Sequence, residues 1–140
     1  YALITVGQIK NASLREELFK RAKNYNFKFP IIISPYSYVS KHSLIGEGTI
    51  IMHMAIINAN AKIGNNCIIN TKSLIEHDVT IGNHVHISTG AIINGGVIIK
   101  NNSFIGSGSV IKQNVKIGEN CFINANTFLD RDLKDNSKTL

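Results

Sequence analysis

Residues 79–99 decide the fold, and they read VTIGNHVHISTGAIINGGVII. Within this stretch isoleucine returns every six residues, at Ile81, Ile87, Ile93 and Ile99. The residue two places before each of these is Val or Ala. Residues two apart on a strand point to the same side. The stretch therefore predicts short strands that turn one large and one small apolar side chain into a common core.

The six-residue repeat extends far beyond this stretch in both directions. Stepping by six from position 39 to position 129 gives sixteen positions, which hold one Val, fourteen Ile and one Leu. The positions two residues earlier hold only Ala, Ser, Thr, Cys or Val. A repeat of this kind predicts short flat faces joined by tight corners around an axis that is filled with isoleucine.

Three such faces close one triangular coil of eighteen residues. Glycine recurs at multiples of eighteen, at Gly46, Gly64, Gly82 and Gly118, with Lys100 at the remaining place. Asparagine is frequent at the expected corners, where a positive φ is often required. The corner asparagines are Asn60, Asn65, Asn83, Asn101 and Asn114. We therefore expect an all-β solenoid over residues 37–131, a parallel β-helix of about five coils stacked roughly 4.8 Å apart, and then a frayed polar tail at 132–140.

The segment before the repeat, residues 1–36, is different in kind. Residues 3–7 read as a strand, and residues 13–16 read as a capping box that opens a helix. The apolar stripe of this helix would hold Leu14, Leu18 and Ala22. Residues 29–33 read as a second strand. One strand-helix-strand unit is too small to bury its own faces, so we expect it to be the last piece of an α/β domain.

Composition and charge exclude several classes of protein. Of the 140 residues, 44% are hydrophobic and 17% are charged, so the chain can bury a core and is not expected to be disordered. No apolar run is long enough for a membrane span. The net charge of +6 suits an anionic ligand, but the lysines are scattered, which disfavours nucleic acid. Cys67 and Cys121 would lie roughly 14 Å apart in the small inward column, too far for a disulfide. We expect a cytoplasmic protein.

The five histidines invite a test for zinc, because γ-class carbonic anhydrases have a β-helix of this kind. Their ligands are one histidine, a second two coils later, and a third five residues after that. From His42 this count leads to Asp78 and Asn83, and from His53 it also misses histidine at both places. We therefore expect no metal site.

His77 is the histidine that suggests chemistry. It follows an inward isoleucine closely, so it should lie near a corner and point outward. Glu76 and Asp78 flank it, and a neighbouring carboxylate can orient an imidazole and raise its basicity. Gly95 and Gly96 follow one coil later, where a glycine lets a backbone N–H approach a ligand closely. A base with an amide donor one coil away is typical of acyl transfer.

The region from residue 68 to residue 97 resembles the NeuD/PglD-type sugar acetyltransferases. The most specific part is Ile-Glu-His-Asp at 75–78 together with His-Ile-Ser at 86–88. The resemblance implies a left-handed β-helix joined to a Rossmann-like sugar-nucleotide-binding domain, of which residues 1–36 would be the C-terminal remnant. It also implies a homotrimer with acetyl-CoA as co-substrate, bound in the groove between neighbouring helices. The expected function is N-acetylation of a nucleotide-linked amino sugar in bacterial glycan biosynthesis.

The same resemblance implies a role for each matching residue. His77 would be the general base, supported by Asp78 or, as the less favoured alternative, by Glu76. Asn70 would help to orient the sugar. The residues that contact acetyl-CoA would be His86, Gly95, Ser107 and Ala125, the last three through their backbone.

Two other functions stay open from the sequence. One is O-acetylation of sialic acid or a related sugar by an enzyme of the same fold. The other is a non-catalytic β-helix scaffold. An ice-binding scaffold needs a regular outward threonine array. One outward row here reads Asn58, Glu76, Asn94, Lys112 and Asp130, which is not such an array.

Overall fold

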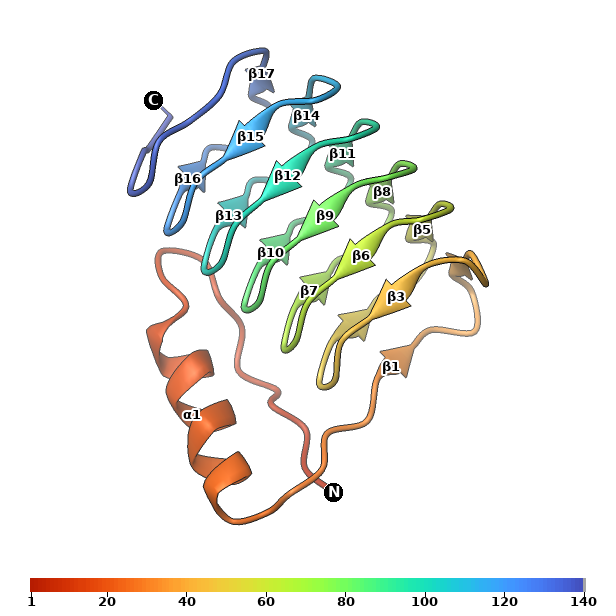
Figure 1. Ribbon diagram of the computed structural model, residues 1–140, viewed down its shortest axis with the longest axis vertical. Helices are drawn as coiled ribbons and strands as arrows, with labels where there is room; N and C mark the ends of the chain where they lie inside the picture. The colour runs from red at the N-terminus through yellow and green to blue at the C-terminus, as the bar shows by residue number, and fades with distance from the viewer. Residues whose placement is uncertain (140) are drawn as a thin grey trace.

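The computed structural model describes residues 1–139 as a tall solenoid with a helix packed beside it (Figure 1). Within this range there are one helix, α1 (Ser13–Asn24), and seventeen strands of two residues each. The strands are β1 Ile32–Ile33, β2 Tyr38–Val39, β3 Leu44–Ile45, β4 Ile50–Ile51, β5 Ile56–Ile57, β6 Lys62–Ile63, β7 Ile68–Ile69, β8 Leu74–Ile75, β9 Thr80–Ile81, β10 His86–Ile87, β11 Ile92–Ile93, β12 Ile98–Ile99, β13 Phe104–Ile105, β14 Val110–Ile111, β15 Lys116–Ile117, β16 Phe122–Ile123 and β17 Phe128–Leu129.

The strands form three parallel sheets, one for each face of the triangular coil. Sheet A has the order β1-β4-β7-β10-β13-β16, sheet B has β2-β5-β8-β11-β14-β17, and sheet C has β3-β6-β9-β12-β15. Each strand residue pairs with the strand residue eighteen positions away, as His86 does with Phe104. The predicted left-handed parallel β-helix of about five coils is confirmed.

The inward isoleucine column forms the core. From Ile51 to Leu129 every member of the column is at most 4% exposed. The apolar residues two places earlier lie in the same cluster, including the free thiols of Cys67 and Cys121. Each fully buried isoleucine stabilises the fold by about 1.5–3 kcal/mol relative to an exposed one. The column is the main source of stability, as the repeat predicted.

The corners divide the asparagines into two kinds. Asn60 and Asn114 have a positive φ, as predicted. Asn65, Asn83 and Asn101 do not, because the positive φ falls on the residue after each of them. Their side chains form a ladder instead, in which each Oδ1 accepts from a backbone N–H one coil below, at 2.8–3.0 Å. The expectation of a positive φ was wrong at these three positions because the side-chain ladder was not foreseen.

The N-terminal segment departs from the predicted strand-helix-strand unit. Residues 3–7 form no strand. The predicted capping box is also absent, because Ser13 is already helical and donates through Oγ to Asn11 Oδ1 at 2.7 Å. On α1 the buried side chains are those of Arg15 and Phe19, while the expected Leu14 is 54% exposed. The strand expected at 29–33 is shortened to β1, which pairs with β4 and so belongs to the solenoid.

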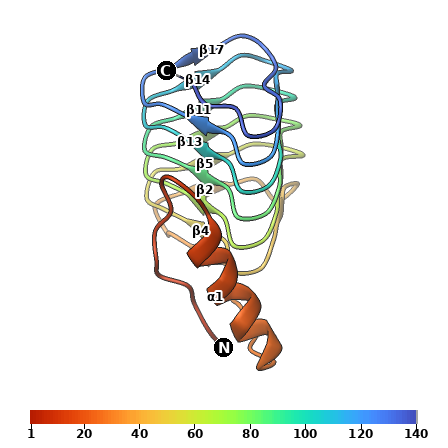
Figure 2. The same cartoon turned by 90° about the vertical axis from the view of Figure 1, so that its left-hand side faces the viewer.

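Helix α1 packs beside the N-terminal half of the solenoid (Figures 1 and 2). Phe19 contacts the ring of His84, Arg15 bonds to Asn66, and Lys23 pairs with Glu47. The rings of Phe19 and Phe29 lie 4.4 Å apart and pack with Ile4. Arg15 is 1% exposed. Its Nη1 donates to the carbonyls of residues 4 and 6 at 2.7 and 2.8 Å, and its Nε donates to Asn66 O at 3.2 Å. These backbone acceptors compensate part of the loss of hydration of the guanidinium.

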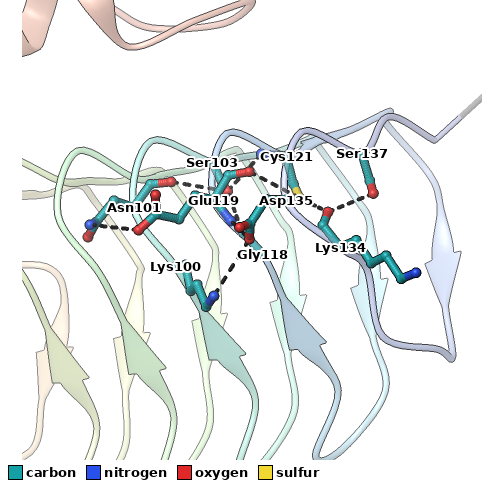
Figure 3. A network of polar contacts seen from close by, with 9 residues as sticks. All are labelled: Lys100, Asn101, Ser103, Gly118, Glu119, Cys121, Lys134, Asp135 and Ser137. Atoms are coloured by element: carbon teal, nitrogen blue, oxygen red, sulfur yellow. Dashed lines mark hydrogen bonds and ion pairs between the residues drawn. The ribbon is translucent and has the colours of Figure 1, made fainter.

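Residues 132–139 continue the solenoid, so the prediction of a frayed tail was wrong for them, and residue 140 lies outside the described range (Figure 3). Leu133 pairs with Ile117 and packs on the core. Asp132 and Asp135 accept from backbone N–H groups of the coil below, at 2.7 and 2.8 Å. These partners lie sixteen residues apart rather than eighteen. The final coil is therefore shorter by two residues, and the six-residue repeat does not reveal it.

Candidate functional site

His77 lies at the corner between β8 and β9, where sheet B meets sheet C. Its side chain is exposed, and its Nδ1 lies 2.8 Å from Asp78 Oδ2. An ionised carboxylate can only accept, so Nδ1 carries the hydrogen. In the neutral ring Nε2 then keeps a free lone pair. The corner thus holds an oriented imidazole that is able to take a proton at Nε2.

The carboxylate of Asp78 is held in its ionised form. The hydrogen bond from His77, followed by the one from Asn60 Nδ2 at 3.3 Å, keeps the pKa of Asp78 below its ordinary value. Glu76 is engaged elsewhere, because its Oε2 accepts from Asn58 Nδ2 at 3.0 Å and from the backbone N–H of His77 at 3.3 Å. The ring of His77 therefore contacts Asp78 and not Glu76.

Gly95 lies directly above the ring of His77, one coil further along. A Cβ at this position would be 2.8 Å from Cε1 and 2.9 Å from Nε2 of His77, so only glycine lets the ring occupy this place. The next residue anchors the two coils, since Gly96 N–H donates to His77 O at 3.1 Å. Among residues 1–139, no group accepts from the N–H of Gly95. A base and a free amide donor therefore meet at this corner.

The other expected site residues lie elsewhere, at the opposite edge of sheet B. Asn70, Ser107 and Ala125 occupy the corners where sheet A passes into sheet B. Asn70 precedes strand β8 and His77 follows it, so the two residues lie at opposite ends of this strand. One chain therefore brings His77, Asp78 and Gly95 together, and it brings Asn70 near His86, but it does not join the two groups.

Ser107 and Ala125 form an exposed backbone column along this second edge. Gly106 lies beneath it, and a Cβ on Gly106 would clash with the backbone of Asn124 and Ala125. Ser107 Oγ lies 2.8 Å from Ser88 Oγ. Among the described residues, neither Ser107 N–H nor Ala125 N–H has an acceptor. Two stacked amides are thus available to a ligand that runs along the solenoid axis.

His86 is buried, and both of its ring nitrogens have partners inside the chain. Nδ1 donates to the carbonyl of Gln8 at 2.6 Å, which fixes the tautomer, because a carbonyl only accepts. Nε2 then accepts from Asn70 Nδ2, 3.2 Å away. Burial lowers the pKa of His86, which favours this neutral form. Gln8, a residue that the sequence did not suggest, thereby fixes His86, and His86 in turn orients Asn70.

Residues 1–139 contain no group of three or more His, Cys, Asp or Glu side chains that could hold a metal ion. Nor does that range contain a helix long and apolar enough to cross a membrane.

Comparison with known proteins identifies the family. The family model described as the GMPPB C-terminal domain matches residues 51–137, which lie almost wholly within the solenoid. No curated protein sequence matches the chain at a significant level.

Solved structures give closer parallels. PerB of Caulobacter crescentus, in complex with CoA and GDP-perosamine, is 32% identical over 91% of this chain, with a TM-score of 0.87. The acetyltransferase domain of PglB from Neisseria gonorrhoeae is 29% identical over 93% of this chain, with a TM-score of 0.90. WeeI from Acinetobacter baumannii is 24% identical over 96% of this chain, with a TM-score of 0.88, and supports the fold. The chain spans 61–63% of the length of the PerB and PglB chains.

These matches confirm the predicted resemblance to sugar acetyltransferases. The chain belongs to the GMPPB C-terminal domain family and to the hexapeptide-repeat β-helix superfamily, whose sugar acetyltransferases are its structural neighbours.

Proposed function

We propose that this chain transfers an acetyl group from acetyl-CoA to the amine of a nucleotide-linked amino sugar, with His77 as the general base. The observation that carries the proposal is the corner itself, where the ring that is hydrogen-bonded to Asp78 packs against Gly95, a residue whose N–H has no acceptor among residues 1–139. PerB, at 32% identity, was solved with CoA and GDP-perosamine, and the PglB domain, at 29%, with acetyl-CoA. These relatives support both the acetyl donor and the class of acceptor.

The reaction follows from the geometry of the corner. The amine nitrogen attacks the thioester carbonyl, a C–N bond forms, and the C–S bond breaks. His77 Nε2 takes the proton that the amine loses and returns it to the departing thiolate. Asp78 stabilises the imidazolium that forms in between. The N–H of Gly95 is free to donate to the oxygen on which negative charge develops.

The Asn70 edge of sheet B would bind the pantetheine arm and the sugar, and the His77 edge would carry out the proton transfer. The stacked amides of Ser107 and Ala125 would bind the amide groups of the pantetheine arm. Asn70 would present its remaining N–H to the sugar, in the orientation that His86 fixes. His86 would have this indirect role in addition to the predicted contact with acetyl-CoA, which stays a prediction. So does the assignment of residues 1–36 to a sugar-nucleotide-binding domain.

A single reaction centre needs both edges, and therefore two copies of the chain. Between the edges the outward side chains of sheet B are all apolar, and Tyr38 and Phe128 are 59% and 66% exposed. The six are Tyr38, Ile56, Leu74, Ile92, Val110 and Phe128. If three such faces surround a threefold axis, the His77 edge of one chain meets the Asn70 edge of its neighbour. A homotrimer would bury the apolar face and complete the site.

Light scattering at micromolar concentration is expected to give three times the chain mass of 15.4 kDa. Mixing His77→Asn chains with Asn70→Ala chains should restore part of the acetyl transfer that each variant lacks, because some interfaces then carry both wild-type residues. A monomer that turns over substrate would contradict the shared site. So would a mixture that is no more active than its components.

Replacing Asp78 by Asn is expected to lower kcat roughly 10- to 100-fold. The amide lacks the charge that stabilises the imidazolium, and it can also rotate and donate to Nδ1. Steady-state thiol release at neutral pH measures the effect. The matched control is Glu76→Gln, which should keep a kcat near wild type, because Glu76 does not contact the ring. A larger loss in the Glu76 variant would transfer the supporting role to Glu76.

The acceptor is tested by a panel of amino-sugar nucleotides and sialic acids, with acetyl-CoA as the donor. Transfer to an amine supports the proposed function. Transfer to the hydroxyl of sialic acid alone would assign the chain to O-acetylation. Absence of both CoA binding and transfer would leave a β-helix scaffold.

A further inference from the structure

A hollow on the outer face of sheet C begins at Asp78, the partner of His77. Six residues line it: His42, Leu44, Asn60, Lys62, Asp78 and Thr80. They form two columns. One runs up the corner through residues 42, 60 and 78, and the other runs along strands β3, β6 and β9, where Lys62 pairs with Leu44 and Thr80. The hollow therefore extends from the reaction corner toward the N-terminal coils.

The lining combines one cation with several neutral donors. Lys62 is exposed, and it belongs to none of the ion pairs found among residues 1–139. The only carboxylate in the lining is Asp78, which already accepts from His77 and Asn60. The imidazole of His42, the second N–H of Asn60 and the hydroxyl of Thr80 can all donate. Such a lining suits an anion that is attached to a polyhydroxylated group.

The spacing of the coils matches the layout of a nucleotide-linked amino sugar. The amine must reach His77, while the diphosphate is attached to the anomeric carbon, elsewhere on the sugar ring. Lys62 lies one coil below Thr80 and His42 lies two coils below Asp78, at roughly 4.8 Å per coil. A sugar whose amine is at the corner therefore extends down the hollow and brings its diphosphate to the level of these two residues.

We infer that this hollow binds the sugar and diphosphate of the acceptor, with Lys62 as the phosphate contact that selects nucleotide-linked over free amino sugars. The inference rests on the proposed function. A lysine binds phosphate as a point charge, which does not require a rigid geometry. The β-helix itself, and not only the α/β part of such enzymes, would then set the choice of acceptor.

A second basic hollow, at the C-terminal end of sheet C, provides the control. It is lined by Lys100, Lys116 and Lys134, but Asp132 and Asp135 lie among them. Lys100 Nζ lies 3.6 Å from Asp135 Oδ1. Lys116 occupies the same outward column as Lys62, three coils further along. It is therefore a matched surface lysine away from the reaction corner.

The test compares acetyl transfer by the full chain to GDP- and UDP-linked amino sugars and to the same amino sugars without the nucleotide. Lys62→Ala should lower kcat/KM roughly 10- to 100-fold for the nucleotide-linked acceptors and leave the free sugars unchanged. Lys62→Arg should retain most of the activity, and Lys116→Ala all of it. Added salt should weaken the wild-type preference for nucleotide-linked acceptors, since screening reduces an exposed phosphate contact.

If Lys62→Ala lowers kcat/KM equally for both kinds of acceptor, or for neither, the inference is overturned. The proposed acetyl transfer would still stand. If the wild type acetylates no sugar, the proposed function fails, and calorimetric titration with GDP and UDP still tests the hollow. Binding that Lys62→Ala weakens and Lys116→Ala preserves supports the site. Equal binding of GDP and UDP by the two variants, or no binding by the wild type, overturns it.

Discussion

Replacing His77 by Asn is expected to lower kcat by about 10²- to 10⁴-fold, the range for loss of a general base. Asparagine has no lone pair of suitable basicity to take the proton of the amine. The binding of acetyl-CoA should change little, because the ring accepts the proton rather than holding the donor. The loss should therefore appear in kcat, measured as thiol release under saturating acetyl-CoA and acceptor.

The His77 variant should melt at the same temperature as the wild type. The side chain is exposed and the isoleucine column lies on the other side of the backbone. A near-normal rate in His77→Asn would reduce His77 to a solvated corner residue.

Replacing Gly95 by Ala should have a comparable effect through geometry alone. The added Cβ would lie 2.8–2.9 Å from the ring of His77, so the ring must swing away. It would then lose its place beside the free amide and its contact with Asp78. A displacement of about 1 Å at a reacting group can lower the rate about 10²-fold. We expect a loss of that size in kcat, with a hydrogen-bonded coil that is otherwise intact.

Gly7→Ala is the matched control for Gly95→Ala, because nothing lies within 4 Å of the added methyl group. It should leave both rate and melting temperature unchanged. A crystal structure of the Gly95 variant should show the displaced ring. If Gly95→Ala transfers acetyl at the wild-type rate, neither the packing of the ring on this glycine nor its amide is needed for the reaction.

The solenoid could be predicted because its code is local and repeated. The isoleucine column imposes one inward direction every six residues, and nothing in the chain from Val39 to Leu129 breaks it. The same periodicity places Gly95 above His77, since one coil is eighteen residues. The contact of His77 with Asp78 is likewise between sequence neighbours. These parts of the site need no tertiary information.

The features that were missed depend on contacts between distant segments or on a change of register. Gln8 reaches His86 across 78 residues, and Arg15 reaches Asn66 across 51. The first of these contacts fixes the orientation of Asn70, yet neither leaves a periodic signal. The last coil could not be predicted from the repeat, because it has sixteen residues instead of eighteen. The pairing of β1 with β4 was not predicted, because the repeat has a small residue two places before each inward isoleucine, and Ile31 stands at that place before Ile33.

The central claim, that His77 is the centre of acetyl transfer to an amino sugar, is tested most directly with acetyl-CoA carrying an isotopic label in its acetyl group. Mass spectrometry follows the label while released CoA is counted. The wild type should place one labelled acetyl group on the sugar nitrogen for each CoA released, and His77→Asn should do so at least about a hundredfold more slowly. Label that stays on CoA in the wild type, or that reaches the sugar equally fast without His77, would contradict the account.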